Sequence, residues 1–166
     1  IRALREANPV FSIISFDPIG YFTRKCGRKG IHFWILVFAC LTTGSINLIY
    51  TESLSTENIT RAVHQHCIEY KFPSTIYVDK GSSCDIRRNQ NIYKKYFNTE
   101  IEVVVCEKSH QMLNFAETSI RLIKKIFSSI FRLRSLKSLP NLTMLELTSL
   151  LAAVKNTANS KPIAGC

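Results

Sequence analysis

Three acidic residues have the type and spacing needed to act together on a phosphate ester. Asp17 and Asp79 each follow a run of β-forming residues and precede a glycine, in the sequences DPIG and DKG. Acids just past strand ends lie where open α/β sheets place their sites. Glu117 lies near the start of a long amphipathic segment, with thirty-seven residues between it and Asp79. Carboxylates that converge are hard oxygen ligands, suited to Mg²⁺ or Mn²⁺.

Two such cations, about 3.5–4 Å apart, polarise a scissile phosphate and stabilise the attacking and leaving oxygens of an in-line displacement. We expect Asp17 to bridge the two ions, with Asp79 on one and Glu117 on the other. A solvated turn is the alternative role for an aspartate after a strand. Glu107 and Asp85 are alternative third acids, but neither begins a helix with basic residues four and seven positions further on.

The elements that position these acids form an α/β pattern. We expect strands at Phe11–Phe16, Ile31–Leu41, Ile46–Tyr50, Thr75–Val78 and Ile101–Cys106, and helices at Ser55–Tyr70, Ile86–Phe97, Phe115–Arg132 and Asn141–Thr157. The breaker cluster Asp17–Gly20 is expected to close the first strand, and Ile31–Leu41, apolar on both faces, to lie centrally. The order βββ-α-β-α-β-α-α predicts helices covering a mixed sheet. It is the order of the ribonuclease-H-like fold, whose five strands lie in the order 3-2-1-4-5.

The charge excess indicates a polyanionic partner. Twenty-two Lys and Arg against twelve Asp and Glu give +10, carried by residues 1–30 at +4 and 108–137 at +6. This predicts a basic face for nucleic acid, with an anionic membrane second. In the long helix, Arg121, Lys124 and Lys125 have two interpretations. They form part of this basic face, or they are only the solvent-exposed side of the helix. The basic turn Arg24–Lys29 has the same two interpretations.

Composition excludes several protein classes. At 46% hydrophobic and 20% charged, the chain is not a disordered tail. Six cysteines without a CxxC pair predict reduced, mostly buried thiols and no zinc site. The longest apolar run, eleven residues, is short of the roughly 20 that a membrane helix needs. The chain opens on Ile, so we expect a segment of a longer polypeptide.

Five motifs in sequence order carry a resemblance to a known family. They are Phe16–Gly20 (FDPIG), Trp34–Leu48 with Glu52–Glu57, Pro73–Gly81 (PSTIYVDKG), Ser109–Lys124 and Asn159–Ile163 (NSKPI). Over about residues 10–163 the chain resembles the catalytic core of retroelement integrases, of the kind found in Pao/BEL-like long-terminal-repeat elements. Tyr21 stands where this family has proline, Asn114 where it has glycine before the glutamate helix, and Lys80–Cys84 replaces Asn-Gly-Thr-Asn-Phe.

The resemblance implies a D,D,E polynucleotidyl transferase, which trims the 3′ ends of element DNA and joins them to target DNA. By motif match Asp17, Asp79 and Glu117 become the catalytic metal ligands, which the resemblance implies hold two ions of Mg²⁺ or Mn²⁺. The residues expected to contact DNA are His110, Asn114, Arg121, Lys124 and Lys125.

The expected organisation is a linker at 1–9, the integrase core at 10–163 and a tail at 164–166. Integrases act as multimers on double-stranded DNA, so we expect a homodimer or higher multimer, no membrane, and nuclear action as part of an element-encoded polyprotein. Two alternatives remain open. One is a catalytically decayed remnant that only binds nucleic acid, and the other is a ribonuclease-H-type nuclease.

Overall fold

The computed structural model describes residues 10–79, 94–95, 98–106, 111–131 and 143–160. The expected linker at 1–9 and tail at 164–166 lie outside these residues. Of the expected helix Ile86–Phe97, only Lys94 and Lys95 are described, and both are helical.

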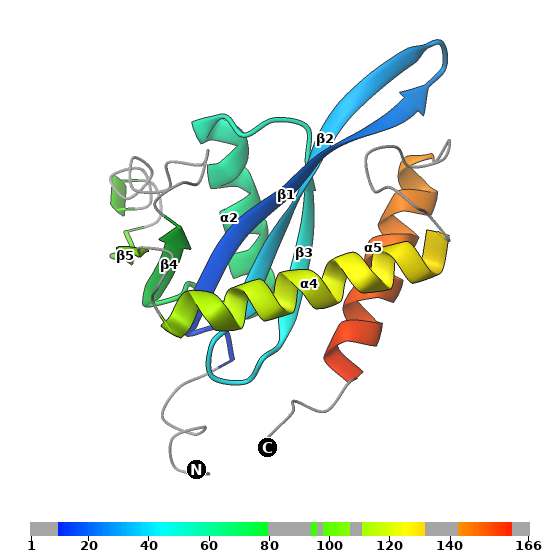
Figure 1. The fold of residues 1–166 in the computed structure, drawn as a ribbon. Helices are drawn as coiled ribbons and strands as arrows, with labels where there is room; N and C mark the ends of the chain where they lie inside the picture. The colour runs from blue at the N-terminus through cyan, green and yellow to red at the C-terminus, as the bar shows by residue number, and fades with distance from the viewer. Residues whose placement is uncertain (1–9, 80–93, 96–97, 107–110, 132–142, 161–166) are drawn as a thin grey trace.

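Five strands form one mixed sheet (Figure 1). They are β1 (Ile13–Cys26), β2 (Lys29–Cys40), β3 (Ile46–Thr51), β4 (Thr75–Asp79) and β5 (Glu102–Cys106), in the order β3-β2-β1-β4-β5. The first three strands form an antiparallel meander, and β1–β4 and β4–β5 pair in parallel. The predicted α/β class and the strand order of the ribonuclease-H-like fold are therefore confirmed.

In the part of the chain that the structure describes, the helices that cover the sheet are α2 (Thr56–Tyr70), α4 (Gln111–Phe131) and α5 (Met144–Ser160). One buried cluster joins α2 to one sheet face, through residues such as Ile59, Val63, Phe16 and Phe38. A second cluster joins α4 and α5 to the other sheet face. None of the described helices is both long enough and apolar enough to cross a membrane.

Strand β2 shows why the sheet is covered on both sides. Phe33, Ile35 and Val37 belong to the α4–α5 cluster, whereas Leu36 and Phe38 belong to the α2 cluster. Each of these side chains is no more than 2% exposed. The prediction that this apolar run lies centrally is confirmed, since alternate residues of a strand point to opposite faces.

The first strand does not end at the DPIG cluster, as we expected from the sequence. It continues to Cys26, because Pro18–Cys26 pairs with Lys29–Leu36 of β2. Within the described residues, β1 pairs with β4 only over Ile13–Ser15, so beyond that point its outer edge has no paired strand. A strand with one open edge tolerates a proline whose missing N–H would face that edge.

Three boundaries of two helices also differ from expectation. Helix α4 begins at Gln111 rather than Phe115. Helix α5 begins at Met144 and ends at Ser160, where we expected Asn141 and Thr157. The hydroxyl of Thr143 accepts a hydrogen bond from the Glu146 amide (3.2 Å) and caps α5. Ser55, where we expected α2 to begin, is its N-cap, since the Ser55 hydroxyl accepts from the Asn58 amide at 3.3 Å.

His66 of α2 is fully buried and lies against the first core cluster. Its ring stacks on Phe38 (centroids 4.5 Å apart, planes at 5°), and its Nδ1 is 2.8 Å from the Asn47 amide nitrogen. Its Nε2 is buried with no hydrogen-bond partner among the described residues. Burial lowers the pKa of His66 from 6.5 to about 4, so the ring is neutral at pH 7.

Acid should therefore destabilise the fold through His66. Between pH 6.5 and 4 the unfolded histidine binds a proton that the folded one does not, so stability is complete above pH 6.5 and falls as the pH drops toward 4. We expect the free energy of unfolding to fall by about 2 kcal/mol between pH 7 and pH 5. His66→Phe should flatten this pH dependence in urea titrations, whatever its stability at pH 7. An unchanged slope in the variant would contradict the assignment.

Asn159 near the end of α5 fastens that helix to the edge strand β3. Its side-chain Oδ1 accepts from the Ile46 amide at 2.7 Å, and its Nδ2 donates to the Ile46 carbonyl at 3.0 Å. Both backbone polar groups of the first residue of β3 are therefore bound by one side chain, 113 positions away in the sequence.

Replacing Asn159 by Ala should destabilise the fold by about 1–3 kcal/mol, because two hydrogen bonds are lost and partly buried backbone groups are left unpaired. The matched control is Asn156→Ala, an exposed asparagine one turn earlier in the same helix. Thermal and urea unfolding of the two variants measure the difference. Equal stability of both variants would show that the Asn159 contacts contribute nothing.

Candidate functional site

The strand register relates Asp17 to Asp79. The parallel pairs Ile13–Thr75 and Ser15–Tyr77 have an offset of 62 residues. The same offset relates Asp17 to Asp79, two residues beyond the last pair. Continued for two residues, this register puts the two positions at the same level of the sheet. Asp79 is the last residue of β4, and Asp17 lies inside β1, partly buried, where the pairing with β4 ends.

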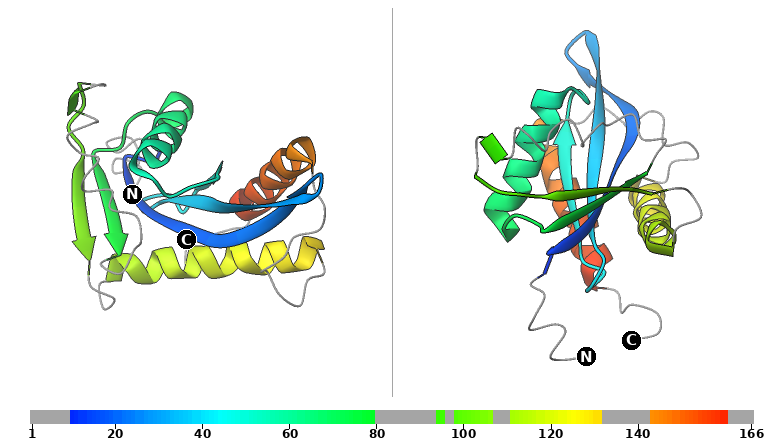
Figure 2. Two further views of the ribbon diagram at one scale, coloured as in Figure 1. Left: turned by 90° about the horizontal axis from the view of Figure 1, so that it is seen from above. Right: turned by 90° about the vertical axis from the view of Figure 1, so that its left-hand side faces the viewer.

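The start of α4 lies beside this part of the sheet. Helix α4 contacts β1, β2 and β4. Both views in Figure 2 show the carboxyl ends of β4 and β5 directed toward the first turns of this helix. The alternation along β1 places Asp17 on the sheet face that carries Ile19, which packs in the cluster with α4. Asp17 therefore faces the side of the sheet that α4 covers.

The position of Glu117 follows from that of Lys124, seven residues later in α4. Lys124 lines one pocket with Ile19 and Tyr21 of β1. Seven helical residues lead back about 10 Å to position 117, and four strand residues lead back about 13 Å from Tyr21 to Asp17. Helix α4 crosses β1 at an angle, and both run away from the β4–β5 side of the sheet (Figures 1 and 2), so position 117 lies on the β4–β5 side of Lys124.

Helix α4 divides its two sides between packing and solvent. Ile123, Ile126 and Phe127 are buried in the second cluster, so the predicted packing stripe is present. Arg121, Lys124 and Lys125 are exposed on the other side, where they line a shallow hollow of about 550 Å³ with Thr118 and Leu122. With a helical repeat of 3.6 residues, positions 117, 121 and 124 share one face. The helix thus aligns a carboxylate position with two cations.

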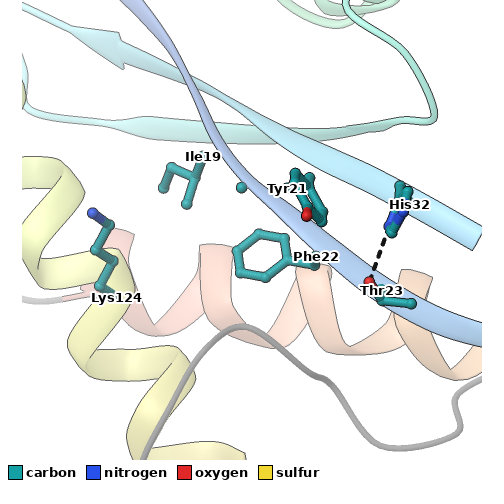
Figure 3. Close-up of a pocket in the computed structure, with 7 residues that line it drawn as sticks. Ile19, Tyr21, Phe22, Thr23, His32 and Lys124 are labelled. Atoms are coloured by element: carbon teal, nitrogen blue, oxygen red, sulfur yellow. Dashed lines mark hydrogen bonds between the residues drawn. The ribbon is translucent and has the colours of Figure 1, made fainter.

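A deeper pocket lies between the β1–β2 hairpin and α4, and we call it the Tyr21 pocket (Figure 3). Its volume is about 620 Å³. Its lining residues are Ile19, Gly20, Tyr21, Phe22, Thr23, His32 and Lys124. Sequence analysis did not assign this site. The available signal was Tyr21, an aromatic where the similar family has proline, but the pocket forms only because the long hairpin brings Tyr21 beside His32 and α4 supplies Lys124.

Some predicted site residues lie outside what the structure describes. His110 and the alternative acids Asp85 and Glu107 are not among the described residues. For Asp79, Asn114 and Glu117 the backbone is described but the side chains are not. Asn114 was expected just before the helix, which we predicted to begin at Phe115. It lies inside α4 instead, because the helix begins at Gln111. Among the described side chains, no group of three His, Cys, Asp or Glu could hold a metal ion.

Arg24 does not belong to a DNA-gripping turn. It lies within β1 and is only 7% exposed. Its Nε donates to the Tyr50 hydroxyl at 3.1 Å, and its guanidinium lies 3.5 Å from the Glu52 carboxylate. Arg24 therefore ties β1 to β3 across the sheet. Arg28 and Lys29 at the hairpin tip are exposed. The two interpretations of this turn, a nucleic-acid contact or a solvated surface, therefore apply only to the tip.

Comparison with known proteins identifies the fold. No family model and no curated protein matches the chain. Among solved structures, a chain of the simian T-cell lymphotropic virus intasome in complex with PP2A regulatory subunit B56 gamma has a TM-score of 0.70 at 15% identity. That similarity covers 95% of this chain and 52% of the intasome chain, so this chain spans about half of it.

Two catalytic core domains are matched over most of their own length. The HTLV-2 integrase catalytic core domain in complex with magnesium, in its dimeric form, has a TM-score of 0.64 at 15% identity, covering 98% of this chain and 95% of that one. The BIV integrase catalytic core domain has a TM-score of 0.62 at 13% identity, covering 93% and 87%. The chain therefore has the fold of integrase catalytic cores, a five-stranded mixed sheet flanked by helices.

The exposed cations of α4 predict salt-dependent binding to double-stranded DNA. Arg121→Ala combined with Lys124→Ala should weaken binding and reduce the slope of log K against log salt by about 2, since each cation releases roughly one counterion. A control with the same charge change is Arg61→Ala combined with Lys94→Ala, whose side chains are 71% and 68% exposed on other elements. Fluorescence anisotropy at several salt concentrations measures both. Equal slopes in the two double variants would identify the α4 cations as a solvated face only.

Proposed function

We propose that this chain is the catalytic core of a retroelement integrase, a D,D,E polynucleotidyl transferase that uses Mg²⁺ or Mn²⁺. The observation that carries the proposal is the parallel register of β1 and β4, which, continued two residues past its last pair, brings Asp17 level with Asp79. Glu117 is the third member, on the helix that lies against the same sheet face. The shared fold and a neighbour crystallised with magnesium support this assignment.

The residues present fit a pair of hard divalent cations. Three carboxylates supply oxygen ligands, which Mg²⁺ and Mn²⁺ prefer. When bound, the cations polarise the scissile phosphate and neutralise charge on the attacking and leaving oxygens. Asp17, Asp79 and Glu117 hold them in this proposal. Asp17 is partly buried. In this proposal the cations stabilise it beside Asp79, because they offset the mutual repulsion of the two negative charges.

The protein's own cations then position the DNA. Arg121 and Lys124 follow Glu117 on one helix face, so they bind phosphate oxygens next to the scissile bond. Lys125 extends this contact to a neighbouring phosphate. Binding energy from these contacts orients the DNA relative to the carboxylates, and correct orientation lowers the barrier of the displacement. His110 and Asn114 remain proposed DNA contacts, on the motif match alone.

The biological setting is proposed from the sequence motifs. The five motifs favour a Pao/BEL-like long-terminal-repeat element, whose integrase acts on element ends and target DNA in the nucleus as part of a polyprotein. A homodimer or higher multimer is proposed as the working state. The intasome and dimeric core structures among the neighbours support assembly of this kind.

Each of Asp17→Asn, Asp79→Asn and Glu117→Gln should reduce Mn²⁺-dependent strand transfer by about 100-fold or more, because the metal supplies several kcal/mol of transition-state stabilisation. The matched control is Glu146→Gln, an exposed acid in the first turn of α5. Circular dichroism checks that all variants fold. Joining of labelled duplex oligonucleotides to plasmid DNA gives the activity, and calorimetry gives Mn²⁺ binding.

The outcomes separate the alternatives. Full activity in any one of the three variants would overturn the ligand assignment. A parent chain that binds DNA but no Mn²⁺ would identify a decayed nucleic-acid-binding remnant. Cleavage of RNA–DNA hybrids with no joining of duplex DNA would favour a ribonuclease-H-type nuclease.

A further inference from the structure

We propose that the open edge of β1, beside the Tyr21 pocket, binds an acidic, extended segment of a partner protein as an additional strand. The inference does not rest on the proposed function, because it uses only the strand edge, the pocket and the charges around them. Pairing of this kind takes its affinity from backbone hydrogen bonds and its specificity from alternate side chains.

The hydrogen bonds at the end of β2 show how its backbone groups alternate. The amide of Leu41, the residue after β2, donates to the Ile13 carbonyl of β1 at 2.9 Å. The amide of Cys40 points the other way and donates to the Ser45 carbonyl, just before β3, at 2.8 Å. Because these directions alternate along a strand, the odd-numbered residues of β2 bond to β1 and the even-numbered ones to β3.

Thr23 and Lys25 therefore present their backbone groups at the open edge. They pair with the even-numbered residues His32 and Gly30, so their N–H and C=O groups face away from β2. Strand β4 pairs with β1 only up to Ser15, and no other backbone group within the described residues bonds to this edge. Strand edges with free donors and acceptors are templates for another strand.

The Tyr21 pocket reaches both faces of the sheet at this edge. Five consecutive residues of β1, Ile19–Thr23, line it, and consecutive strand residues point to opposite faces. Phe22 and Lys124 lie on the side of α4, whereas Tyr21 lies on the other side with its ring centroid 4.5 Å from that of His32 (Figure 3). An added strand projects its side chains alternately to the two faces, so the pocket fits an extended chain.

The charge around the edge selects an acidic segment. Lys124 lines the pocket, and Arg121 and Lys125 line the neighbouring hollow of α4. Arg28 and Lys29 are exposed at the tip of the hairpin. Among the described residues, no acid lines either depression. Opposite charges on adjacent strands stabilise their pairing and like charges destabilise it, so glutamate and aspartate side chains suit this edge.

Two other occupants satisfy the edge less well. Nucleic acid is also negatively charged, but its phosphate oxygens only accept hydrogen bonds and would leave the carbonyls of Thr23 and Lys25 unpaired. A second copy of the chain would bring two basic edges together, and charged side chains on edge strands oppose such contacts. An acidic polypeptide strand supplies donors, acceptors and complementary charge.

The experiment measures the binding of labelled eight-residue peptides to the full chain by fluorescence anisotropy. The first peptide alternates glutamate and valine, the second is the same peptide with its four central amides N-methylated, and the third alternates lysine and valine. We expect the first to bind about tenfold more tightly than either of the others, because N-methylation removes backbone donors and lysine reverses the charge. The first peptide should also slow amide hydrogen exchange at Thr23 and Lys25.

Variants of the chain locate the binding. Thr23→Pro removes the outward amide at an edge position that tolerates proline, and should weaken binding of the first peptide by about fivefold or more. Thr23→Ala keeps the amide and should bind as the parent does. Lys124→Ala should weaken binding by about two- to fivefold, and its control Lys94→Ala, 68% exposed on another element, should not. Circular dichroism checks folding, and the exchange measurement on the parent stays decisive if Thr23→Pro unfolds.

The outcomes separate the occupants. Equal binding of the N-methylated peptide would show charge attraction alone and overturn strand pairing. Failure of the first peptide to bind, or unchanged exchange at Thr23 and Lys25, would overturn the proposal outright. Protection of these amides without peptide would assign the edge to a second copy if it rises with protein concentration, and to another segment of this chain if it does not. Strand transfer enters none of these readouts, so failure of the proposed function is measured separately.

Discussion

The site depends on the point at which β1 changes from a strand paired on both sides to a strand paired on one. Over Ile13–Ser15 the strand lies between β2 and β4, and the parallel register with β4 sets which residues are level. Beyond Ser15, within the described residues, only β2 continues the pairing. Asp17 stands two residues beyond this change, and β1 continues from there into the lining of the Tyr21 pocket. One strand thus supplies an acid for the proposed metal site and five of the residues that line the Tyr21 pocket, Ile19–Thr23.

Helix α4 provides the complementary side of the same arrangement. Its buried residues Ile123 and Phe127 pack against the sheet with almost no exposure, and this fixes the helix along β1. Because the apolar stripe occupies one side, the opposite side carries the cations of the helix at 3.6-residue spacing. Glu117 and Lys124 belong to that side. The packing of the helix therefore also decides which residues meet the DNA.

Strong local signals made much of the fold predictable. The apolar run of β2 is buried on both faces, and the Ser55 cap and the strand order are as expected. The errors arose where long-range pairing overrides local chemistry. A proline and a glycine after Asp17 signal a strand end, yet pairing with β2 extends β1 to Cys26. Arg24 looked like a solvent-exposed turn residue, and its burial depends on Tyr50 and Glu52 of distant sequence. The Tyr21 pocket could not be predicted for the same reason, because its lining combines residues of β1, β2 and α4.

The central claim is that Asp17, Asp79 and Glu117 converge on divalent cations, and a crystal structure grown with Mn²⁺ tests it most directly. The account predicts anomalous density within about 2.1 Å of carboxylate oxygens from both Asp17 and Asp79, with Glu117 bound to the same ion or to a second one nearby. Absence of manganese from these oxygens, a Glu117 side chain directed away from both aspartates, or the Lys80 ammonium seated between them would contradict it.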